Sequence, residues 1–353
     1  MPRPIQARID LSALERNLQV ARRAGSARIM AVIKANAYGH GLLRAAEALN
    51  AAEGFALLDI RDAICLRDAG FSQTILLLEG FFTPDDLPLV AEYDLACVIH
   101  NQQQIDMLEA YPSRGSLEVW FKVGSGMNRL GFAPDKVPAA LERLKAHPAV
   151  RDITLMTHFA HADEATGVAA QLDVFNTLAP YRMARSLANS AALLRYPATH
   201  ADWVRPGIML YGASPFAEVS AQQLGLQPVM TLQSRIIAVQ ELRAGENIGY
   251  GGLFRTEAPT RVGVVACGYA DGYPRHAPTG TPVLVEGQRT RILGRISMDM
   301  LSVDLSTLPA ADVGSHVTLW GEGLPVEQVA HAAGTISYEL LCALAERVPI
   351  VTV

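Results

Sequence analysis

The residue best suited to chemistry in this chain is Lys34, because it follows an uninterrupted apolar run at residues 29–33. Such a run predicts a strand that is buried on both faces, as in a parallel sheet. The sheet would deliver the lysine to its carboxyl edge, close to Tyr38, Gly39 and Gly41. Partial burial lowers the pKa of an amine, and a neutral amine forms a Schiff base with an aldehyde. The alternative is a lysine that merely ends a strand and reaches water.

Polar side chains also follow several later apolar runs. The set comprises Lys122, Arg129, His158, Asn189, Ser190 and Arg205. If the runs are strands of one barrel, their carboxyl ends share one rim, which is where barrel enzymes bind substrates. That rim would be positively charged and suited to a phosphate or a carboxylate. Taken singly, Arg205 is as consistent with a structural role as with a functional one, and so is His158 as an interior histidine. Their shared location at one rim favours a functional role for both.

The sequence around these residues does not match two common types of binding site, a nucleotide loop and a metal site. The glycines around Ser125 lack the Gly-Lys-Ser/Thr sequence of a phosphate-binding loop, which argues against a Walker nucleotide site. His158 and His161 are followed by Asp163 and Glu164, but no matching set of histidines or carboxylates follows the other predicted strands. A resident metal ion is therefore not expected.

The elements that would position these residues alternate in the first part of the chain. Apolar runs predict parallel strands at residues 28–34, 54–59, 74–79, 95–100, 117–123, 152–158, 185–189 and 202–211. Helical patterns lie between them, as at residues 12–23, where Ser12 and Glu15 would form a capping box. Eight strands joined through helices predict a (β/α)8 barrel of TIM type, assigned to residues 1–225.

From residue 226 the pattern changes to longer alternating runs separated by turn residues. The runs cover residues 230–242, 261–266, 282–304 and 316–320. Alternation predicts strands with one buried face, so we expect a mostly antiparallel β domain over residues 226–353. Helical segments are expected near 325–333 and 338–347. The predicted fold class is therefore α/β, a barrel followed by a β domain.

Length, charge and cysteine content narrow the class of protein further. A chain of 353 residues suits two domains. The net charge is −5 and the basic residues are scattered, so neither a nucleic acid nor an anionic membrane is an expected partner. No apolar run approaches the length of a membrane-spanning helix, and the amino end has no hydrophobic signal segment, which favours a cytoplasmic protein. The cysteines lie far apart and suit reduced thiols: Cys65, Cys97, Cys267 and Cys342.

Several motifs, taken in order, resemble the alanine racemase family over essentially the whole chain. They are AVIKANAYGHG (31–41), GMNRLG (126–131), THFA (157–160), WVRPGI (203–208), GYG (249–251), GYADGY (268–273), GRISMD (294–299) and SYE (337–339). The resemblance implies a barrel with a C-terminal β domain, pyridoxal 5'-phosphate as cofactor, and interconversion of L- and D-alanine. It also implies a homodimer in which each β domain completes the partner's active site. The product would serve peptidoglycan synthesis, or the enzyme would act in alanine breakdown.

The resemblance implies that two bases exchange the substrate proton on opposite faces. Lys34 would hold the cofactor as a Schiff base and act as one base, and Tyr250 of the partner subunit would act as the other. A tyrosine hydroxyl is ordinarily a poor base near neutral pH. In the family a hydrogen-bonded chain runs from this tyrosine through His158 to Arg205. Arg205 would contact the pyridine nitrogen, and because it cannot accept a proton it would weaken the electron sink and suppress side reactions.

Further roles are implied for the remaining candidates. The cofactor phosphate would be bound by Tyr38, Ser190, Tyr338 and the backbone N–H groups of Gly207 and Ile208, with Asn189 beside it as a further cofactor-binding candidate. Arg129 would contact the phenolic oxygen of the cofactor and, with the backbone at Met298 of the partner subunit, the substrate carboxylate. Lys122 would be a carbamylation site that orients Arg129. An access channel that admits only small side chains would be lined by Asp163, Tyr269, Arg275 and Arg295.

Two departures from the family pattern lie near the substrate. Residues 123–125 read Val-Gly-Ser where an acidic residue is common, and Ser297 stands where a cysteine or alanine is common. Three other functions were weighed: a broader racemase for small amino acids, a cofactor-binding homeostasis protein on a similar barrel, and a decarboxylase of related fold. The lack of an export signal argues against the first, the β domain with Tyr250 against the second, and the motifs at 249–251 and 297–299 against the third.

Overall fold

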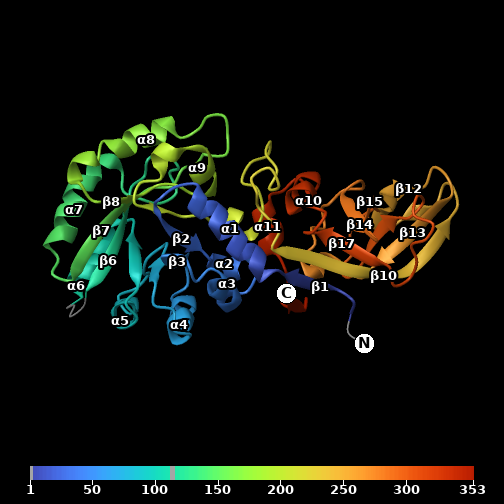
Figure 1. Ribbon diagram of the computed structural model, residues 1–353, viewed down its shortest axis with the longest axis horizontal. Helices are drawn as coiled ribbons and strands as arrows, with labels where there is room; N and C mark the ends of the chain where they lie inside the picture. The colour runs from blue at the N-terminus through green and yellow to red at the C-terminus, as the bar shows by residue number, and fades with distance from the viewer. Residues whose placement is uncertain (1–2, 112–115) are drawn as a thin grey trace.

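The computed structural model describes residues 3–111 and 116–353, so Met1 and Pro2 of the amino end discussed above lie outside the described residues. The chain forms two lobes, a barrel ringed by helices and a β domain (Figure 1). This architecture confirms the fold class predicted from the sequence. The division between residues 225 and 226 stays a prediction.

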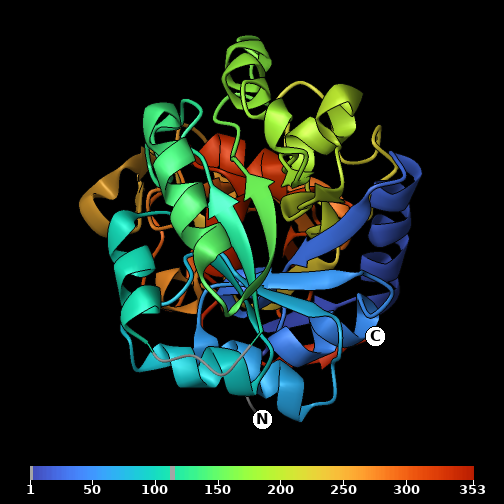
Figure 2. The same ribbon diagram turned by 90° about the vertical axis from the view of Figure 1, so that its left-hand side faces the viewer.

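Parallel strands form the wall of the barrel, with helices around it (Figure 2). Each strand overlaps one of the predicted runs. Within the described residues the closed barrel follows chain order: β2 (Arg28–Val32), β3 (Gly54–Leu57), β4 (Thr74–Leu77), β5 (Ala96–Ile99), β6 (Leu117–Lys122), β7 (Val150–Met156), β8 (Ala184–Ser186) and β9 (Trp203–Val204).

The burial of these strands explains their apolar sequences. β3 and β5 are buried at every position, so neither face can carry the polar residues of an alternating pattern. The run at 202–211 is strand only as far as Val204. Pro206 cannot donate to a strand ladder, and Ile208–Tyr211 forms a 3₁₀ helix instead. The last predicted strand was therefore too long.

Helices follow the strands and cover the barrel. The first begins one residue earlier than predicted and is capped by Asp10, whose carboxylate accepts a hydrogen bond from the Ala13 N–H at 3.0 Å. The capping box predicted at Ser12 was wrong, because Asp10 stands in extended conformation just outside the helix and satisfies the same free N–H groups. The helices are α1 (Leu11–Arg23), α3 (Leu42–Ala48), α4 (Ile60–Asp68), α5 (Asp86–Glu92), α6 (Gln102–Ala110), α7 (Val137–Ala146), α8 (Ala169–Asn176) and α9 (Ser190–Arg195).

The second lobe is a mostly antiparallel sheet, as predicted. The predicted run 282–304 is divided by turns into three strands. A short ribbon pairs β11 (Asn247–Ile248) with β12 (Phe254–Arg255). In the part of the chain that the structure describes, the main sheet has the order β13 (Thr260–Val265), β16 (Leu301–Asp304), β15 (Gln288–Leu293), β14 (Pro282–Val285), β17 (His316–Trp320), β10 (Met230–Leu242), β1 (Gln6–Ile9) and β18 (Ile350–Thr352).

The two ends of the chain meet in this sheet. β1 precedes the barrel in sequence, yet it pairs antiparallel with β10 and parallel with β18. β1 is therefore a strand of the second lobe, although its residues precede the barrel in the sequence. Two helices complete the lobe, α10 (Val326–Ala333) close to its predicted position and α11 (Ser337–Cys342), which is shorter than the predicted segment 338–347.

α11 connects the two lobes, because it packs against α2 (Lys34–Tyr38), the turn that begins with Lys34. A Cβ atom added at Gly39 would lie 2.2 Å from the carbonyl oxygen of Leu341. Gly39 also has a φ of 79°, so both its conformation and this close approach require glycine. The contact brings the C-terminal segment to the carboxyl end of the first barrel strand.

Candidate active site

The turn that carries Lys34 is left-handed. β2 ends at Val32, two residues before the lysine, and residues 35–38 all have φ between 52° and 54°. The turn is hydrogen-bonded like a helix, with the Gly39 N–H donating to the Ala35 carbonyl oxygen at 3.0 Å. A left-handed helical conformation costs about 1–2 kcal/mol per residue for L-amino acids. The surrounding structure must therefore hold this turn in place.

Two side chains of the turn's own sequence stabilise it. Burial lowers the pKa of His40 to about 4, so its ring is neutral at physiological pH. The ring Nδ1 lies 3.0 Å from the carbonyl oxygen of Ala37 and 2.9 Å from that of Tyr38, which assigns the proton to Nδ1 as the donor. Asn36 Oδ1 accepts a hydrogen bond from the Leu42 N–H at 2.9 Å. No role had been predicted for His40.

Lys34 has the properties of a nucleophilic amine. Burial lowers its pKa, and the positive charge of Arg129 lowers it further. A larger neutral fraction of the amine follows, which Schiff-base chemistry requires. The Cys342 thiol, at the end of α11, is close enough for its charge to interact with Lys34, although burial raises the pKa of this thiol.

Cations gather around a hollow of about 210 Å³ beyond the ends of β6 and β7. Its lining includes Lys122, Arg129 and His158. Burial lowers the pKa of Lys122 to about 8, and the neighbouring cations, Arg205 first among them, contribute to this shift. Burial and the same cations lower the pKa of His158 to about 3. His158 is therefore neutral, and the hollow is suited to anions.

Arg205 lies fully inside the barrel and contacts neutral acceptors. Its Nη1 donates to Ser186 Oγ at 2.5 Å, and its Nη2 donates to the carbonyl oxygens of Thr157 at 2.5 Å and Leu187 at 3.2 Å. Burial lowers the pKa of Arg205 to about 10, which leaves it a cation at neutral pH. These acceptors orient the guanidinium group without neutralising its charge, unlike the carboxylate expected for a structural salt bridge.

A group of small and hydroxyl-bearing residues forms a cradle beside Tyr38. The Gly207 N–H donates to Ser190 Oγ at 2.8 Å. A Cβ atom added at Gly207 would lie 2.7 Å from the Tyr38 hydroxyl oxygen. Ile208 follows and is fully buried. Asn189 lies next to the cradle, but its side chain caps α9 by accepting from the Ala192 N–H at 3.0 Å.

The C-terminal segment adds Tyr338 to the same place. Its ring centroid lies 6.0 Å from that of Tyr38. Burial raises the pKa of Tyr338, and the charge of Asp163 raises it further, so Asp163 is close to this tyrosine. The structure thus brings together Lys34, Tyr38 and Tyr338 with one of the predicted access-channel residues.

The other predicted residues lie on the β domain. Tyr250 is 68% exposed and Met298 is 52% exposed. Tyr250 follows β11 and precedes β12, which lies at the end of the β domain remote from the barrel (Figure 1). A Cβ atom added at the preceding Gly249 would lie 3.4 Å from the Arg295 carbonyl oxygen, and Arg275 lies 6.0 Å from the ring centre of Tyr269. The structure does not bring Tyr250 to Lys34 of the same chain.

Two residues that support the site were not found from the sequence. The Tyr211 ring stacks on Tyr38 with centroids 4.6 Å apart, and its hydroxyl donates to the Val32 carbonyl oxygen at 2.9 Å. Gln171 is buried and donates to Ser125 Oγ and to the His158 carbonyl oxygen, both at 3.2 Å. Tyr211 lies in an apolar run and Gln171 has no distinctive spacing, so no sequence pattern indicated a role for either residue.

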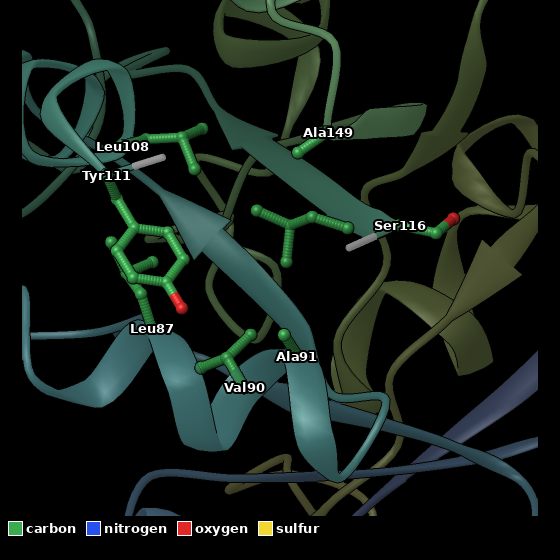
Figure 3. Close-up of a pocket in the computed structure, with 8 residues that line it drawn as sticks. Leu87, Val90, Ala91, Leu108, Tyr111, Ser116 and Ala149 are labelled. Carbon is green, nitrogen blue, oxygen red and sulfur yellow. The ribbon is translucent and has the colours of Figure 1, made fainter. Parts of the chain in front are cut away.

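A second, apolar hollow of about 290 Å³ shares no lining residue with the first, and Figure 3 shows the side chains that line it. It lies between α5 and α6 and near the amino ends of β6 and β7, and its lining includes Leu87, Leu108 and Tyr111. Barrel enzymes bind substrates at the opposite, carboxyl end of the strands. This hollow is therefore not part of the candidate active site.

Two further observations concern metals and membranes. Among residues 3–111 and 116–353, no three His, Cys, Asp or Glu side chains are grouped so that they could hold a metal ion. Within the same described ranges, no helix combines the length and the apolar character that a membrane span needs. The cytoplasmic location expected from the sequence stays a prediction.

The fold and the site define the class of this protein: an enzyme on a (β/α)8 barrel in which a nucleophilic lysine stands among cations at the carboxyl rim. Residues 9–215 match the family described as "Alanine racemase, N-terminal domain", and residues 229–352 match "Alanine racemase, C-terminal domain". The chain belongs to the alanine racemase family, as the sequence motifs indicated.

Individual relatives are similar over the whole length. The chain is 65% identical over 357 residues to the alanine racemase of Nitrosospira multiformis, with 100% of both chains covered. Its structure matches the biosynthetic alanine racemase of Pseudomonas aeruginosa with a TM-score of 0.98 at 48% identity, covering 99% of each chain. The alanine racemase of Acinetobacter baumannii matches with a TM-score of 0.92 at 39% identity, covering 99% of this chain and 100% of that one.

Proposed function

We propose that this chain interconverts L- and D-alanine, with pyridoxal 5'-phosphate as its cofactor and a second copy of the chain completing each site. The observation that carries this proposal is Lys34, a partly buried amine of lowered pKa at a cationic barrel rim. Relatives that match the whole chain are alanine racemases, which supports alanine as the substrate.

The residues fit this cofactor at both of its ends. Lys34 is suited to the aldehyde, and the cradle of Tyr38, Ser190 and Gly207 is suited to the phosphate because it offers hydroxyl and N–H donors. A side chain at Gly207 would collide with the Tyr38 hydroxyl, so glycine lets Tyr38 lie directly against this backbone. Within this proposal Ile208 and Tyr338 add to the cradle, and Asn189 remains a neighbouring candidate.

Arg205 sets the electronic environment of the site. When bound, the cofactor supplies an electron sink for the electron pair at the substrate Cα. Within the proposal Arg205 faces the pyridine nitrogen, held by Ser186, Thr157 and Leu187. A guanidinium group donates hydrogen bonds and accepts no proton, so it leaves that nitrogen unprotonated. The weaker sink limits reactions other than proton exchange at Cα.

Racemisation requires a proton-exchanging group on each face of Cα. Lys34 takes up or returns the proton at Nζ on one face, for which its lowered pKa is suited. Tyr250 of the partner subunit acts at its hydroxyl on the other face. The exposed position of Tyr250, away from Lys34 of its own chain, is the reason that the proposal requires a homodimer. His158 relays hydrogen bonding from this tyrosine to Arg205.

Substrate binding and access involve both subunits in this proposal. Arg129 and the backbone of the partner's Met298 bind the alanine carboxylate, and Arg129 also contacts the phenolic oxygen of the cofactor. The access channel is formed by Asp163 from the barrel and by residues of the partner's β domain. The latter are Tyr269 and Arg275, which are exposed, and Arg295, which is half-buried.

Lys122 is proposed to be carbamylated. Its pKa of about 8 makes the neutral amine available near physiological pH. The Lys122 ammonium group first loses one proton, and the neutral amine then adds to carbon dioxide. One N–C bond forms as one C=O π bond opens, and the nitrogen releases a second proton, so a cation becomes an anion beside Arg129. Intact mass measured with and without bicarbonate tests this: a bicarbonate-dependent gain of one carbon dioxide is expected, and it should be absent in Lys122→Arg.

The proposed function is tested by incubating the protein with L-alanine and pyridoxal 5'-phosphate in deuterated water. Deuterium at Cα and the chirality of alanine are followed together. Deuterium that appears along with D-alanine is the expected result. Deuterium with retained L configuration would leave Lys34 active but remove Tyr250 as the second base. No exchange with alanine would overturn the assigned substrate, and other small amino acids would then be screened.

A further inference from the structure

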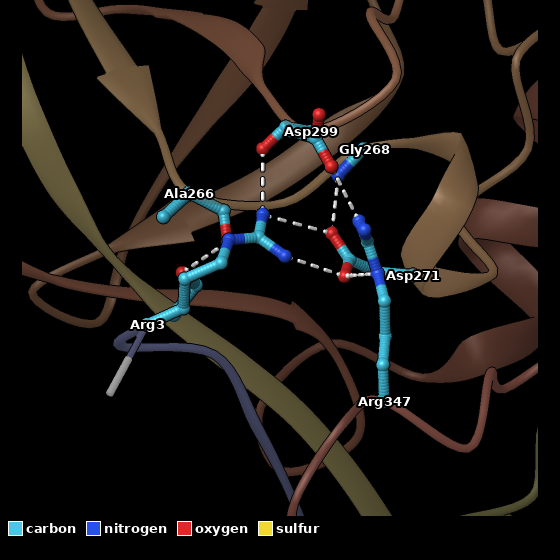
Figure 4. A network of polar contacts seen from close by, with 7 residues as sticks. Arg3, Ala266, Gly268, Asp271, Asp299 and Arg347 are labelled. Atoms are coloured by element: carbon cyan, nitrogen blue, oxygen red, sulfur yellow. Dashed lines mark hydrogen bonds and ion pairs between the residues drawn. The ribbon is translucent and has the colours of Figure 1, made fainter.

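A buried carboxylate in the β domain binds two arginines from opposite ends of the chain (Figure 4). The Asp271 side chain is 0% exposed. Arg3 contacts both of its oxygens, at 2.8 and 3.1 Å, and Arg347 Nε donates to Oδ1 at 2.8 Å. The Gly268 N–H donates to Oδ2 at 2.9 Å. Burial by itself would raise the pKa of Asp271, but these hydrogen bonds lower it below its ordinary value.

The same two arginines also contact a second turn. Arg347 Nη2 donates to Asp299 Oδ1 at 2.6 Å, and Arg3 Nη2 donates to the Asp299 carbonyl oxygen at 2.8 Å. Asp271 ends a first turn at residues 268–271, and Asp299 ends a second at residues 297–299. The arginines therefore hold these two turns together. We call them the first and the second entrance turn.

The backbones of the two entrance turns are in direct contact. The Tyr269 N–H donates to the Ser297 carbonyl oxygen and the Ala270 N–H to the Met298 carbonyl oxygen, both at 3.0 Å. A Cβ atom added at Gly268 would lie 2.4 Å from the Met298 carbonyl oxygen, so glycine permits this approach. Each turn carries one exposed side chain, Tyr269 at 37% and Met298 at 52%.

We propose that Asp271 is a positioning residue for the substrate entrance, which acts through Arg3 and Arg347 to fix Tyr269 and Met298 relative to each other. The inference rests on the proposed function, in which the Tyr269 side chain and the Met298 backbone serve the partner's active site. Asp271 itself is buried beneath the turns and contacts no substrate. Its effect is transmitted by the hydrogen bonds between the turns.

The effect of removing the carboxylate should be local. Arg3 and Arg347 have about 40% of their side chains exposed, at 40% and 41%, so each can turn to solvent once its anion is lost. The first entrance turn also meets the segment after α11, where the Ala345 N–H donates to the Asp271 carbonyl oxygen at 3.2 Å. This backbone contact remains in a side-chain variant, so the turn should loosen without unfolding the domain.

The test compares Asp271→Asn with Asp304→Asn. Asp304 is also a largely buried carboxylate of the β domain bound to an arginine, with Arg291 Nε at 3.1 Å, but it lies outside the entrance turns. Three quantities are measured on the cofactor-loaded protein: amide hydrogen exchange at Tyr269 and Ala270, KM and kcat for alanine, and the absorbance of the bound cofactor.

In Asp271→Asn we expect both amides to exchange about tenfold faster or more, because the docking of the two turns is weakened. KM should rise about five- to tenfold while kcat changes less than about twofold, since binding at the entrance is affected and the proton exchange is not. The cofactor absorbance should be unchanged. Asp304→Asn should match the wild type in all three.

Several results would overturn the proposal. Faster exchange with an unchanged KM would reduce Asp271 to a purely structural residue, and unchanged exchange would remove it altogether. If Asp271→Asn does not fold, Arg347→Gln, which removes one exposed partner, must give the same direction of change in exchange and KM. A wild-type protein without racemase activity would instead contradict the proposed function. In that case, unchanged exchange in Asp271→Asn would still overturn the role of Asp271.

Discussion

The rings of Tyr38 and Tyr338 lie with their centroids 6.0 Å apart and are tilted by 45°. Tyr38 comes from the turn after the first barrel strand and Tyr338 from α11, near the end of the chain. The C-terminal domain thus contributes to the barrel site of its own chain. The same domain holds Tyr250 away from that site. In the proposed dimer, Tyr338 therefore serves the active site of its own chain, and Tyr250 serves the active site of the partner.

Replacing Lys34 by alanine should abolish covalent attachment of pyridoxal 5'-phosphate, the proposed cofactor. Lys34 has a partly buried amine of lowered pKa and begins the turn that carries Tyr38, and alanine has no group that forms a Schiff base. Borohydride reduction followed by mass measurement of the peptide gives the readout. Lys136→Ala, at a lysine that is 73% exposed, should retain the adduct. A borohydride-trapped adduct in Lys34→Ala would refute the assignment.

Replacing Ala35 by glycine should stabilise the protein. Ala35 is exposed and has a φ of 54°, a conformation that glycine adopts without the penalty of a Cβ atom. We expect a gain of roughly 0.5–1 kcal/mol in the free energy of unfolding, measured by denaturant titration without cofactor. Ala139→Gly, at an exposed position of the right-handed helix α7, should cost a similar amount. Loss of stability in both variants would contradict a left-handed turn.

Replacing Tyr250 by phenylalanine should affect the two directions of turnover differently. If Tyr250 exchanges the proton on one face only, its loss should change the deuterium isotope effect in one direction more than in the other. We expect turnover to fall by about 100-fold or more, as for loss of a general acid or base. The readout is the rate with Cα-deuterated L- and D-alanine. Tyr181→Phe on the barrel exterior serves as the control, and unchanged rates in both directions would exclude Tyr250.

The buried histidines should make the protein less stable in mild acid. The pKa of His40 falls from 6.5 to about 4 on folding, so below pH 6.5 the unfolded chain binds a proton that the folded protein excludes. Stability is therefore lost as the pH decreases from about 6.5 toward 4. At pH 5 the suppressed protonation of His40 lowers the free energy of unfolding by roughly 2 kcal/mol.

This pH dependence is measured by denaturant titration at pH 5 and pH 7.5. His40→Asn keeps a donor near the position of Nδ1 but does not titrate. The loss of unfolding free energy between pH 7.5 and pH 5 should therefore be smaller in this variant by about the contribution of His40. His331→Gln, at an exposed position of α10, should leave the difference unchanged. An unchanged difference in His40→Asn would show that His40 is not held neutral.

Local sequence patterns determined the elements of this protein. The buried strands before Lys34 and at 54–57 could be recognised because burial on both faces leaves only apolar residues in a parallel strand. The alternating runs after residue 226 identified the β domain for the corresponding reason, because strands such as β16 bury alternate positions, although β14 is buried at every position. The order of the motifs then identified the family.

The tertiary structure alone decided how distant elements meet. The left-handed turn at residues 35–38 contains two alanines, and no local propensity favours a positive φ at alanine. The pairing of β1 with β18, the contact of Tyr38 with Tyr338, and the burial of Asp271 between Arg3 and Arg347 join the two ends of the chain to its interior. Such contacts depend on the packing of whole domains, because periodicity reports which face of an element is buried and not what covers it.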